Sequence, residues 1–145
     1  MAAPINDTTK VNEIITALEG NTLEQLVPDG GDWLDKINQA WNMLGIDLRL
    51  KRDIDLTEIN TVDDTGADNG IQQQLTYAQA FKTLKLIFFD NLDNVNADNE
   101  ETFKLKADEY EGKYQEIISQ MVIPIDVDAD GTTDTDSEPE VRLVI

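Results

Sequence analysis

The chain has 145 residues, of which 30 are acidic and 11 are basic, so its formal net charge at pH 7 is -19. This length fits a single domain with one core. Nucleic-acid binders neutralise phosphates with clustered lysine and arginine, so a chain this acidic is disfavoured as a DNA or RNA binder. An acidic surface instead suits a basic protein partner, divalent cations, or a wall past which DNA slides.

The residue types that are missing exclude several kinds of site. The chain contains no cysteine and no histidine, which removes disulfides, the usual zinc sites and histidine-based acid/base catalysis. Serine occurs only at Ser119 and Ser137, outside any recognisable catalytic setting, and there is no glycine-rich phosphate loop. No signal peptide and no membrane-length apolar run is present. We therefore expect a protein that is not an enzyme, has no membrane partner, and acts in a cytoplasm or in an assembly built there.

Residues 8–19 are predicted to form the first helix. Four apolar residues recur there at the spacing of one helical face: Val11, Ile14, Ile15 and Leu18. Such a stripe is typical of a helix that buries one side against a core. Gly20 follows the last turn, and glycine commonly ends a helix, so we expect the helix to stop there.

A second helix is predicted over residues 33–44. Asp32 is placed to cap its N-terminus and Gly45 to end it. Both tryptophans of the chain, Trp33 and Trp41, lie in this segment. Exposed tryptophan is rare, so we expect both side chains in the core.

Residues 46–56 alternate apolar and polar side chains almost strictly, which indicates a strand or an extended arm. The densest basic patch of the chain lies here: Arg49, Lys51 and Arg52. One interpretation is an edge strand guarded by charge. The other is an arm that binds an acidic partner, such as the next copy of the same protein. On that interpretation these three residues bind a partner.

Two long helices are predicted in the second half of the chain, after a polar loop at residues 60–70. The first covers residues 71–92, and its apolar run at residues 86–89 has to be enclosed, so we expect the centre of the core there. The second covers residues 98–120 and repeats apolar residues in steps of three and four: Phe103, Ala107, Tyr110, Tyr114, Ile117 and Met121. We expect the two helices to form an antiparallel hairpin with tyrosine hydroxyls at its edge.

The predicted fold class is mainly α, a small helical bundle of about four helices with an extended arm and an extended C-terminal tail. Residues 1–122 would form the bundle, with the extended segment near residues 46–60, and residues 123–145 would form an acidic loop and the tail. The tail is apolar apart from one arginine: Val141, Arg142, Leu143, Val144 and Ile145. A helical bundle offers such a strand no partner, so these five residues are candidate partner-binding residues.

The acidic loop contains part of a calcium-binding motif. Positions 1, 3, 5, 6 and 9 of an EF-hand loop, where alternate oxygen ligands converge on one cation, are matched by Asp126, Asp128, Asp130, Gly131 and Asp134. The bidentate glutamate of position 12 is missing, because Ser137 stands there, and Pro139 blocks the helix that should follow. Two interpretations stay open. In the first, the loop is a calcium site with the four aspartates as ligands, and no other cofactor is expected. In the second, the loop is a plain acidic turn.

Four stretches of the chain form a recognisable series after the short first helix and the Trp-bearing second one. They are the run Leu84-Lys-Leu-Ile-Phe-Phe89, the helix Lys104-Leu-Lys-Ala-Asp-Glu-Tyr110-x-x-Lys-Tyr114, the Asp/Gly-rich loop at residues 126–134 and the tail at residues 141–145. In this series the chain resembles the small helical head-to-tail connector (adaptor) proteins of tailed bacteriophages. The resemblance spans most of residues 8–145 and rests on pattern, without an invariant chemical motif.

The resemblance implies a structural virion protein at the head-to-tail interface, assembled in the host cytoplasm. It implies a ring of about 12 copies that docks on the portal protein and links it to the next neck or tail component. Arms or tails would grip these partners, and an acidic lumen would let DNA pass without specific binding. An acidic calcium-binding or protein-interaction module is the alternative, and a nucleic-acid mimic that blocks a basic protein is a third.

Overall fold

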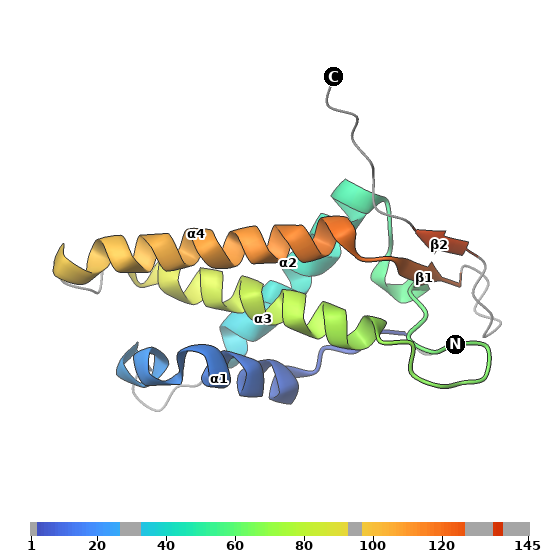
Figure 1. Ribbon diagram of the computed structural model, residues 1–145, viewed down its shortest axis with the longest axis horizontal. Helices are drawn as coiled ribbons and strands as arrows, with labels where there is room; N and C mark the ends of the chain where they lie inside the picture. Colours follow the sequence, from blue (N-terminus) through green and yellow to red (C-terminus); the bar gives the residue numbers. More distant parts are fainter. Residues whose placement is uncertain (1–2, 27–32, 93–96, 127–134, 138–145) are drawn as a thin grey trace, which may run out of the picture.

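The computed structural model describes residues 3–26, 33–92, 97–126 and 135–137. Within these ranges the elements are α1 (Thr8–Leu26), α2 (Leu34–Arg52), the 3-10 helix η1 (Leu56–Glu58), α3 (Ile71–Asp90), α4 (Ala97–Gln120), β1 (Ile123–Ile125) and β2 (Thr135–Ser137) (Figure 1). The prediction of a mainly helical fold, a small bundle of about four helices, is confirmed. None of the helices in the described ranges is long and apolar enough to cross a membrane.

α3 is the central helix of the bundle. Figure 1 shows α4 running beside α3 in the opposite direction, α1 along the other side of α3, and α2 crossing obliquely. Most side chains of α3 are buried, among them Leu75, Leu84 and Phe88. A helix that other helices cover on several sides has to be apolar around most of its circumference. This arrangement confirms the predicted antiparallel hairpin. Of the run at residues 86–89 that was expected at the centre of the core, Leu86, Ile87 and Phe88 are buried.

The core consists of two clusters that share α3 and α4. In the first cluster, which also involves α1, the ring of Phe88 packs edge-on against Phe103 with 5.1 Å between ring centroids. In the second, which also involves α2 and β1, Tyr114 is fully buried. The predicted apolar stripe of α4 is confirmed with one shift at its end, because Ile118 is fully buried and Ile117 only partly.

The aromatic side chains that were expected in the core divide between core and surface. Trp33 is buried in the first cluster, and Trp41 packs half-buried against the second. Phe89 was predicted inside the enclosed end of its helix, and this prediction is wrong, because its side chain is 55% exposed. It points away from buried Phe88 by the 100° that separates neighbours on a helix, and the ammonium group of Lys85 lies over its ring at 5.0 Å.

The predicted end of the first helix at Gly20 is also wrong, because α1 continues to Leu26. The helix is interrupted just before the glycine, where Glu19 has non-helical angles (φ -138°, ψ 22°). The carboxylate of Glu19 accepts hydrogen bonds from Lys106 and Tyr110 of α4. Beyond the kink, Leu23 is buried in the core. Contacts with other helices therefore hold the second half of α1 against the local tendency of glycine to end a helix.

The largest correction concerns residues 46–52, which were predicted as an extended arm or strand and are the last two turns of α2. Apolar residues at every second position alternate between two nearly opposite faces of a helix, since each step of two residues turns about 200°. Leu44 and Leu48 are fully buried on one face, whereas Ile46 and Leu50 are 57% and 78% exposed. The alternating pattern of residues 46–52 therefore comes from a helix that has apolar residues on two opposite faces.

Gly45, the predicted stop of the second helix, lies inside α2 and allows a close contact instead. A Cβ atom at this position would lie 3.0 Å from Cδ1 of Leu56, which is tighter than ordinary van der Waals contact. The helix ends at Arg52, where Asp53 takes the left-handed conformation (φ 53°, ψ 44°) and its N–H donates to the carbonyl oxygen of Leu48. Glycine is the residue usually found in that conformation, so nothing in the composition of this stretch marked the true end.

The loop at residues 60–70 was predicted as polar, and the structure shows it held by its own side chains. Asp63 accepts hydrogen bonds from the hydroxyl and backbone N–H of Thr65 and from the backbone N–H of Ala67. These hydrogen bonds, that from the Thr65 hydroxyl first, lower the pKa of Asp63 below its ordinary value. The amide of Asn69 donates to the carbonyl oxygens of Asn60 and Val62. Side-chain hydrogen bonds within the loop thus shape the turn that leads into α3.

Candidate functional site

β1 joins three separate parts of the chain into one small layer. It pairs with β2 in an antiparallel register that places Ile123 opposite Ser137 and Ile125 opposite Thr135. On its other side two backbone hydrogen bonds join it to the end of η1 and the residues just after it: the N–H of Asn60 donates to Pro124, and the N–H of Asp126 donates to Glu58. In Figure 1 this layer lies at the end of the molecule where α4 ends and η1 begins. Segments far apart in sequence therefore meet here.

Arg52, in the last turn of α2, holds this layer to the helices. Its guanidinium donates to the carbonyl oxygen of Ile118 at 2.9 Å and to the carbonyl oxygen and hydroxyl of Ser137 at 2.8 and 3.1 Å. The carbonyl of Ile118 belongs to the last turn of α4, where carbonyl groups lack partners within the helix and favour a cation. We name these three hydrogen bonds the Arg52 clasp.

The other two residues of the predicted basic patch also bind within the chain. Arg49 forms an ion pair with Asp55 at 2.5 Å, and Lys51 donates to the side chain of Gln115. The backbone and hydroxyl groups of Thr57 lower the pKa of Asp55, with Arg49 contributing less. The three basic residues thus remain at one end of the molecule, but on a helix. Arg49 and Lys51 are exposed, so contacts to a partner stay a prediction for them.

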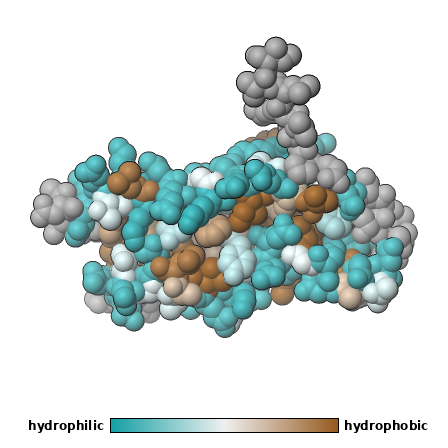
Figure 2. Space-filling view, viewed as in Figure 1, coloured by the Kyte–Doolittle hydropathy of each residue, from teal (hydrophilic) through white to brown (hydrophobic). Residues whose placement is uncertain are grey.

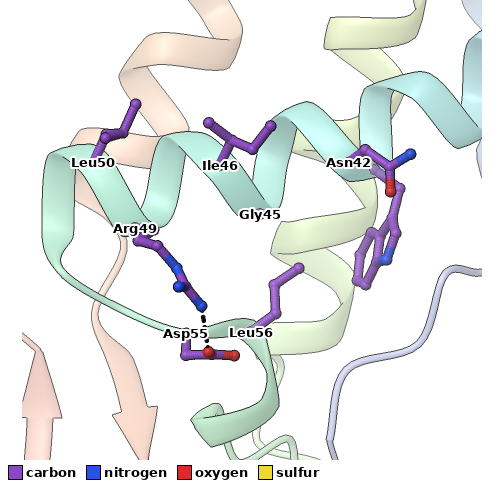
Figure 3. A pocket seen from close by; sticks show the side chains of 8 residues that line it. Asn42, Gly45, Ile46, Arg49, Leu50, Asp55 and Leu56 are labelled. Carbon is purple, nitrogen blue, oxygen red and sulfur yellow. Dashed lines mark hydrogen bonds and ion pairs between the residues drawn. The ribbon is translucent and has the colours of Figure 1, made fainter.

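A groove runs along the same end of α2, which we name the α2 groove (Figure 3). Its volume is about 430 Å³, and its lining includes Trp41, Gly45, Ile46, Arg49, Leu50 and Leu56. In Figure 3 Arg49 reaches toward Asp55 while Ile46 and Leu50 stand along the other edge of the helix. The lining combines exposed apolar surface with one ion pair, which suits binding of an apolar segment.

A larger hollow of about 620 Å³ lies between the start of α3 and the end of α4. Its lining is rich in amides around one aromatic ring, and it includes Gln73, Gln74, Tyr77, Glu116 and Gln120. Only one carboxylate is among the lining residues, and none of them is cationic. The lining therefore offers amide groups, one aromatic ring and one carboxylate to a ligand. The sequence pattern did not reveal it, because its residues come from helices 40 positions apart.

The predicted calcium site lies mostly outside the described residues, since only Asp126 of its four aspartates is within them. Asp126 is buried, and its backbone N–H donates to the carbonyl oxygen of Glu58. Asp128, Asp130 and Asp134 fall outside the described ranges, as do Val141, Arg142, Leu143, Val144 and Ile145. Among the residues that the structure describes, no group of three acidic side chains could hold a metal ion. Calcium binding and tail binding both stay predictions.

Three polar pairs that join α4 to the other helices were missed by sequence reasoning. Lys82, whose side chain is 5% exposed, forms an ion pair with Glu111 at 2.9 Å. The hydroxyl groups of Tyr110 and Tyr114 donate to Glu19 and Asp47 respectively, which agrees with the expectation that tyrosine hydroxyls lie at the edge of the hairpin. One signal for Lys82 was present, since it lies on the apolar stripe of α3. These pairs tie α4 to α3, α1 and α2.

Comparison of the chain with protein-family models, with curated proteins and with solved structures finds no match. The resemblance to phage connector proteins therefore rests on the sequence pattern alone. The helical bundle agrees with what that resemblance implies for the fold. Ring formation, the portal and the tail partner stay predictions.

Proposed function

We propose that this protein is a structural connector of a tailed bacteriophage, located at the head-to-tail interface of the virion. About 12 copies form a ring by a closed rotation. The ring docks on the portal protein and links it to the next neck or tail component. DNA passes through its acidic lumen without specific binding, and the protein assembles in the host cytoplasm.

The observation that carries this proposal is the Arg52 clasp. It fixes Ser137, the residue from which the C-terminal segment departs, to the ends of α2 and α4. Hydrogen bonds that involve a charged donor are stronger than neutral ones, so the root of the tail belongs to the rigid body of the bundle. A connector needs this property, because a partner-binding segment transmits position only when its root is fixed.

The charge distribution supports the lumen part of the proposal. Among the side chains of α4 whose burial is described, five carboxylates are exposed: Glu100, Glu101, Asp108, Glu109 and Glu116. Two exposed lysines, Lys104 and Lys113, offset them in part, and Lys113 is already paired with Glu109. A surface with excess negative charge repels phosphate groups and keeps DNA mobile beside it. The outer face of α4 is therefore the surface that we assign to the lumen.

The experiment that tests the proposal is incorporation into virions. Tagged full-length protein is expected in purified particles, as a ring between portal and tail in averaged electron micrographs of the neck. Deletion of residues 141–145 is expected to leave the helical circular dichroism spectrum unchanged, because the described core is complete without them, and to abolish incorporation. Leu105→Ala, an exposed position on α4, is the matched control and should incorporate normally.

Two results would contradict the connector. One is normal incorporation of the chain that lacks residues 141–145. The other is a full-length protein that is absent from particles and whose melting temperature rises with calcium. If Asp126→Ala combined with Asp128→Ala removed that rise, the calcium-binding module would take the place of the connector.

A further inference from the structure

Ile46 and Leu50 form an apolar patch on the outer face of α2. They lie one helical turn apart and are 57% and 78% exposed. The helices that pack against α2 contact its other face, where Leu44 and Leu48 are fully buried. Figure 2 shows that hydrophobic patches interrupt a surface that is otherwise largely hydrophilic on the face it presents. No part of the described chain covers Ile46 and Leu50, and the α2 groove continues from them toward Leu56.

The chain itself contains a segment of complementary chemistry. In an extended conformation, side chains at alternate positions share one face, so Val141, Leu143 and Ile145 would form an apolar edge and Arg142 would point the other way. Among the side chains of residues 141–145 there is one positive charge and no negative one, which limits repulsion from a protein of net charge -19. Asp55, which is paired with Arg49, lines the groove and offers a carboxylate to Arg142.

The position of the tail root decides which copy supplies the segment. Ser137 is bound to Arg52. Leu50 lies two residues before Arg52, so the side chains of Leu50 and Arg52 point about 200° apart around α2. Arg52 is half-buried against α4, whereas Leu50 faces outward. Residues 138–140 span about 10 Å at most, which equals the diameter of a helix, about 10 to 12 Å. To reach the groove of its own molecule, the tail would need the full length of residues 138–140 merely to pass around α2. A neighbouring molecule can place its tail in the groove directly.

We propose that the α2 groove of one molecule binds residues 141–145 of a second copy. The contact is heterologous, since groove and tail are different surfaces, and repetition of such a contact closes a ring when the rotation allows it. This inference deepens the proposed function and rests on it for the ring, because it names the contact between copies. The contact itself requires neither a portal nor a virion.

Purified full-length protein tests the contact by native mass spectrometry and sedimentation over a range of concentrations. The wild type is expected to self-associate, and both Leu50→Glu and deletion of residues 141–145 are expected to weaken association at least tenfold. Leu105→Glu, which adds the same charge at an exposed leucine of α4, is expected to associate like the wild type. Equal loss in this control, or a wild type that stays monomeric at every concentration, would overturn the proposal.

A mixing experiment separates the two halves of the contact. Leu50→Glu has an intact tail and the truncated chain has an intact groove, so the mixture is expected to form heterodimers that neither variant forms alone. Because the chain has no cysteine, Leu50→Cys and Leu143→Cys in differently tagged copies provide a second readout, with a disulfide expected between the two tagged copies. No heterodimers in the mixture, or cross-linking only within one copy of a double-cysteine chain, would overturn the assignment to a second copy.

The two proposals fail in different ways. Self-association through the groove by a protein that is absent from virions would leave this contact standing and remove the connector. Incorporation into a virion neck together with unaltered assembly of Leu50→Glu would leave the connector standing and remove this contact.

Discussion

Arg52 and Ser137 are joined by a hydrogen bond of 2.8 Å from the guanidinium to the backbone carbonyl, although they are 85 residues apart in sequence. The same guanidinium bonds to Ile118 in α4. One side chain thus connects the end of α2, the end of α4 and β2. The end of the molecule that we assign to partner binding is organised around this residue, which was predicted to act outward on an extended arm.

Arg52→Ala is expected to lower the free energy of unfolding by about 1.5 to 3 kcal/mol, since it removes charged hydrogen bonds and leaves part-buried carbonyl oxygens without their donor. Lys51→Ala is the matched control. It removes an exposed cation with one side-chain partner, and we expect a change within about 0.5 kcal/mol. Urea unfolding measures both values. Equal effects of the two substitutions would show that the clasp adds nothing to stability.

Phe88 and Phe89 are neighbours that differ in burial, at 0% and 55% exposed. Phe88→Ala is expected to cost about 3 to 5 kcal/mol, because it empties the centre of the first core cluster. Phe89→Ala is expected to cost less than about 1 kcal/mol, the range of an exposed contact between a cation and a ring. Thermal and urea unfolding of both variants test the pair. A large loss in Phe89→Ala would mean that its ring is covered in solution.

Tyr114 is expected to make the stability of the protein fall at alkaline pH. Burial, and then the hydrogen bond to Asp47, raise the pKa of Tyr114 well above its ordinary value of 10.0. Because the pKa of Tyr114 is raised in the folded state, its contribution to the free energy of unfolding is fully present below pH 10. This contribution is lost as the pH rises further, because only the unfolded chain ionises readily. Tyr114→Phe is therefore expected to flatten the decline in stability above pH 10.

Urea unfolding between pH 8 and 11.5 measures this difference. Tyr77→Phe, which removes the hydroxyl of an exposed tyrosine, serves as the control for general effects of high pH. At neutral pH, Tyr114→Phe should cost about 0.5 to 1.5 kcal/mol for the lost hydrogen bond. Curves of wild type and Tyr114→Phe that run parallel up to pH 11.5 would refute the prediction.

Glu111 is expected to make the stability of the protein fall at acid pH. Burial acts to raise the pKa of Glu111, but the hydrogen bonds from Lys82 and Gln115 outweigh it and lower the pKa below the ordinary 4.5. The contribution of Glu111 to the free energy of unfolding is therefore present above pH 4.5 and is lost as the pH falls through the lowered pKa of the folded state. Glu111→Gln is expected to cost about 1 to 3 kcal/mol at pH 7, less than for a fully buried pair, because Glu111 is partly exposed.

The measurement is the stability difference between wild type and Glu111→Gln from pH 7 down to pH 3. This difference should shrink below pH 4.5, because protonation then removes the same charge from the wild type. Glu116→Gln, an exposed carboxylate on the same helix, controls for the loss of one charge. A constant difference over the whole range would exclude the ion pair as the source of the effect.

The long helices were predictable because their signals are repetitive. α4 repeats apolar residues over about five turns, and its predicted range of residues 98–120 differs by one residue from Ala97–Gln120. The end of α2 was not predictable in this way. Every second residue there is apolar, and this pattern fits a strand as well as a helix with two apolar faces. Only the burial of Leu48 and the exposure of Leu50 distinguish the two.

The sequence by itself determined the fold class, the order of the helices, the stripe that joins α3 to α4, and the acidic character that disfavours nucleic-acid binding. These depend on composition and on short-range periodicity, which each stretch of chain carries alone. The tertiary structure decided where α1 and α2 end, that Arg52 turns inward to Ile118 and Ser137, and that Ile46 and Leu50 stay exposed. These depend on contacts between residues far apart in sequence, and such contacts override the local preference of a glycine or an alternating segment.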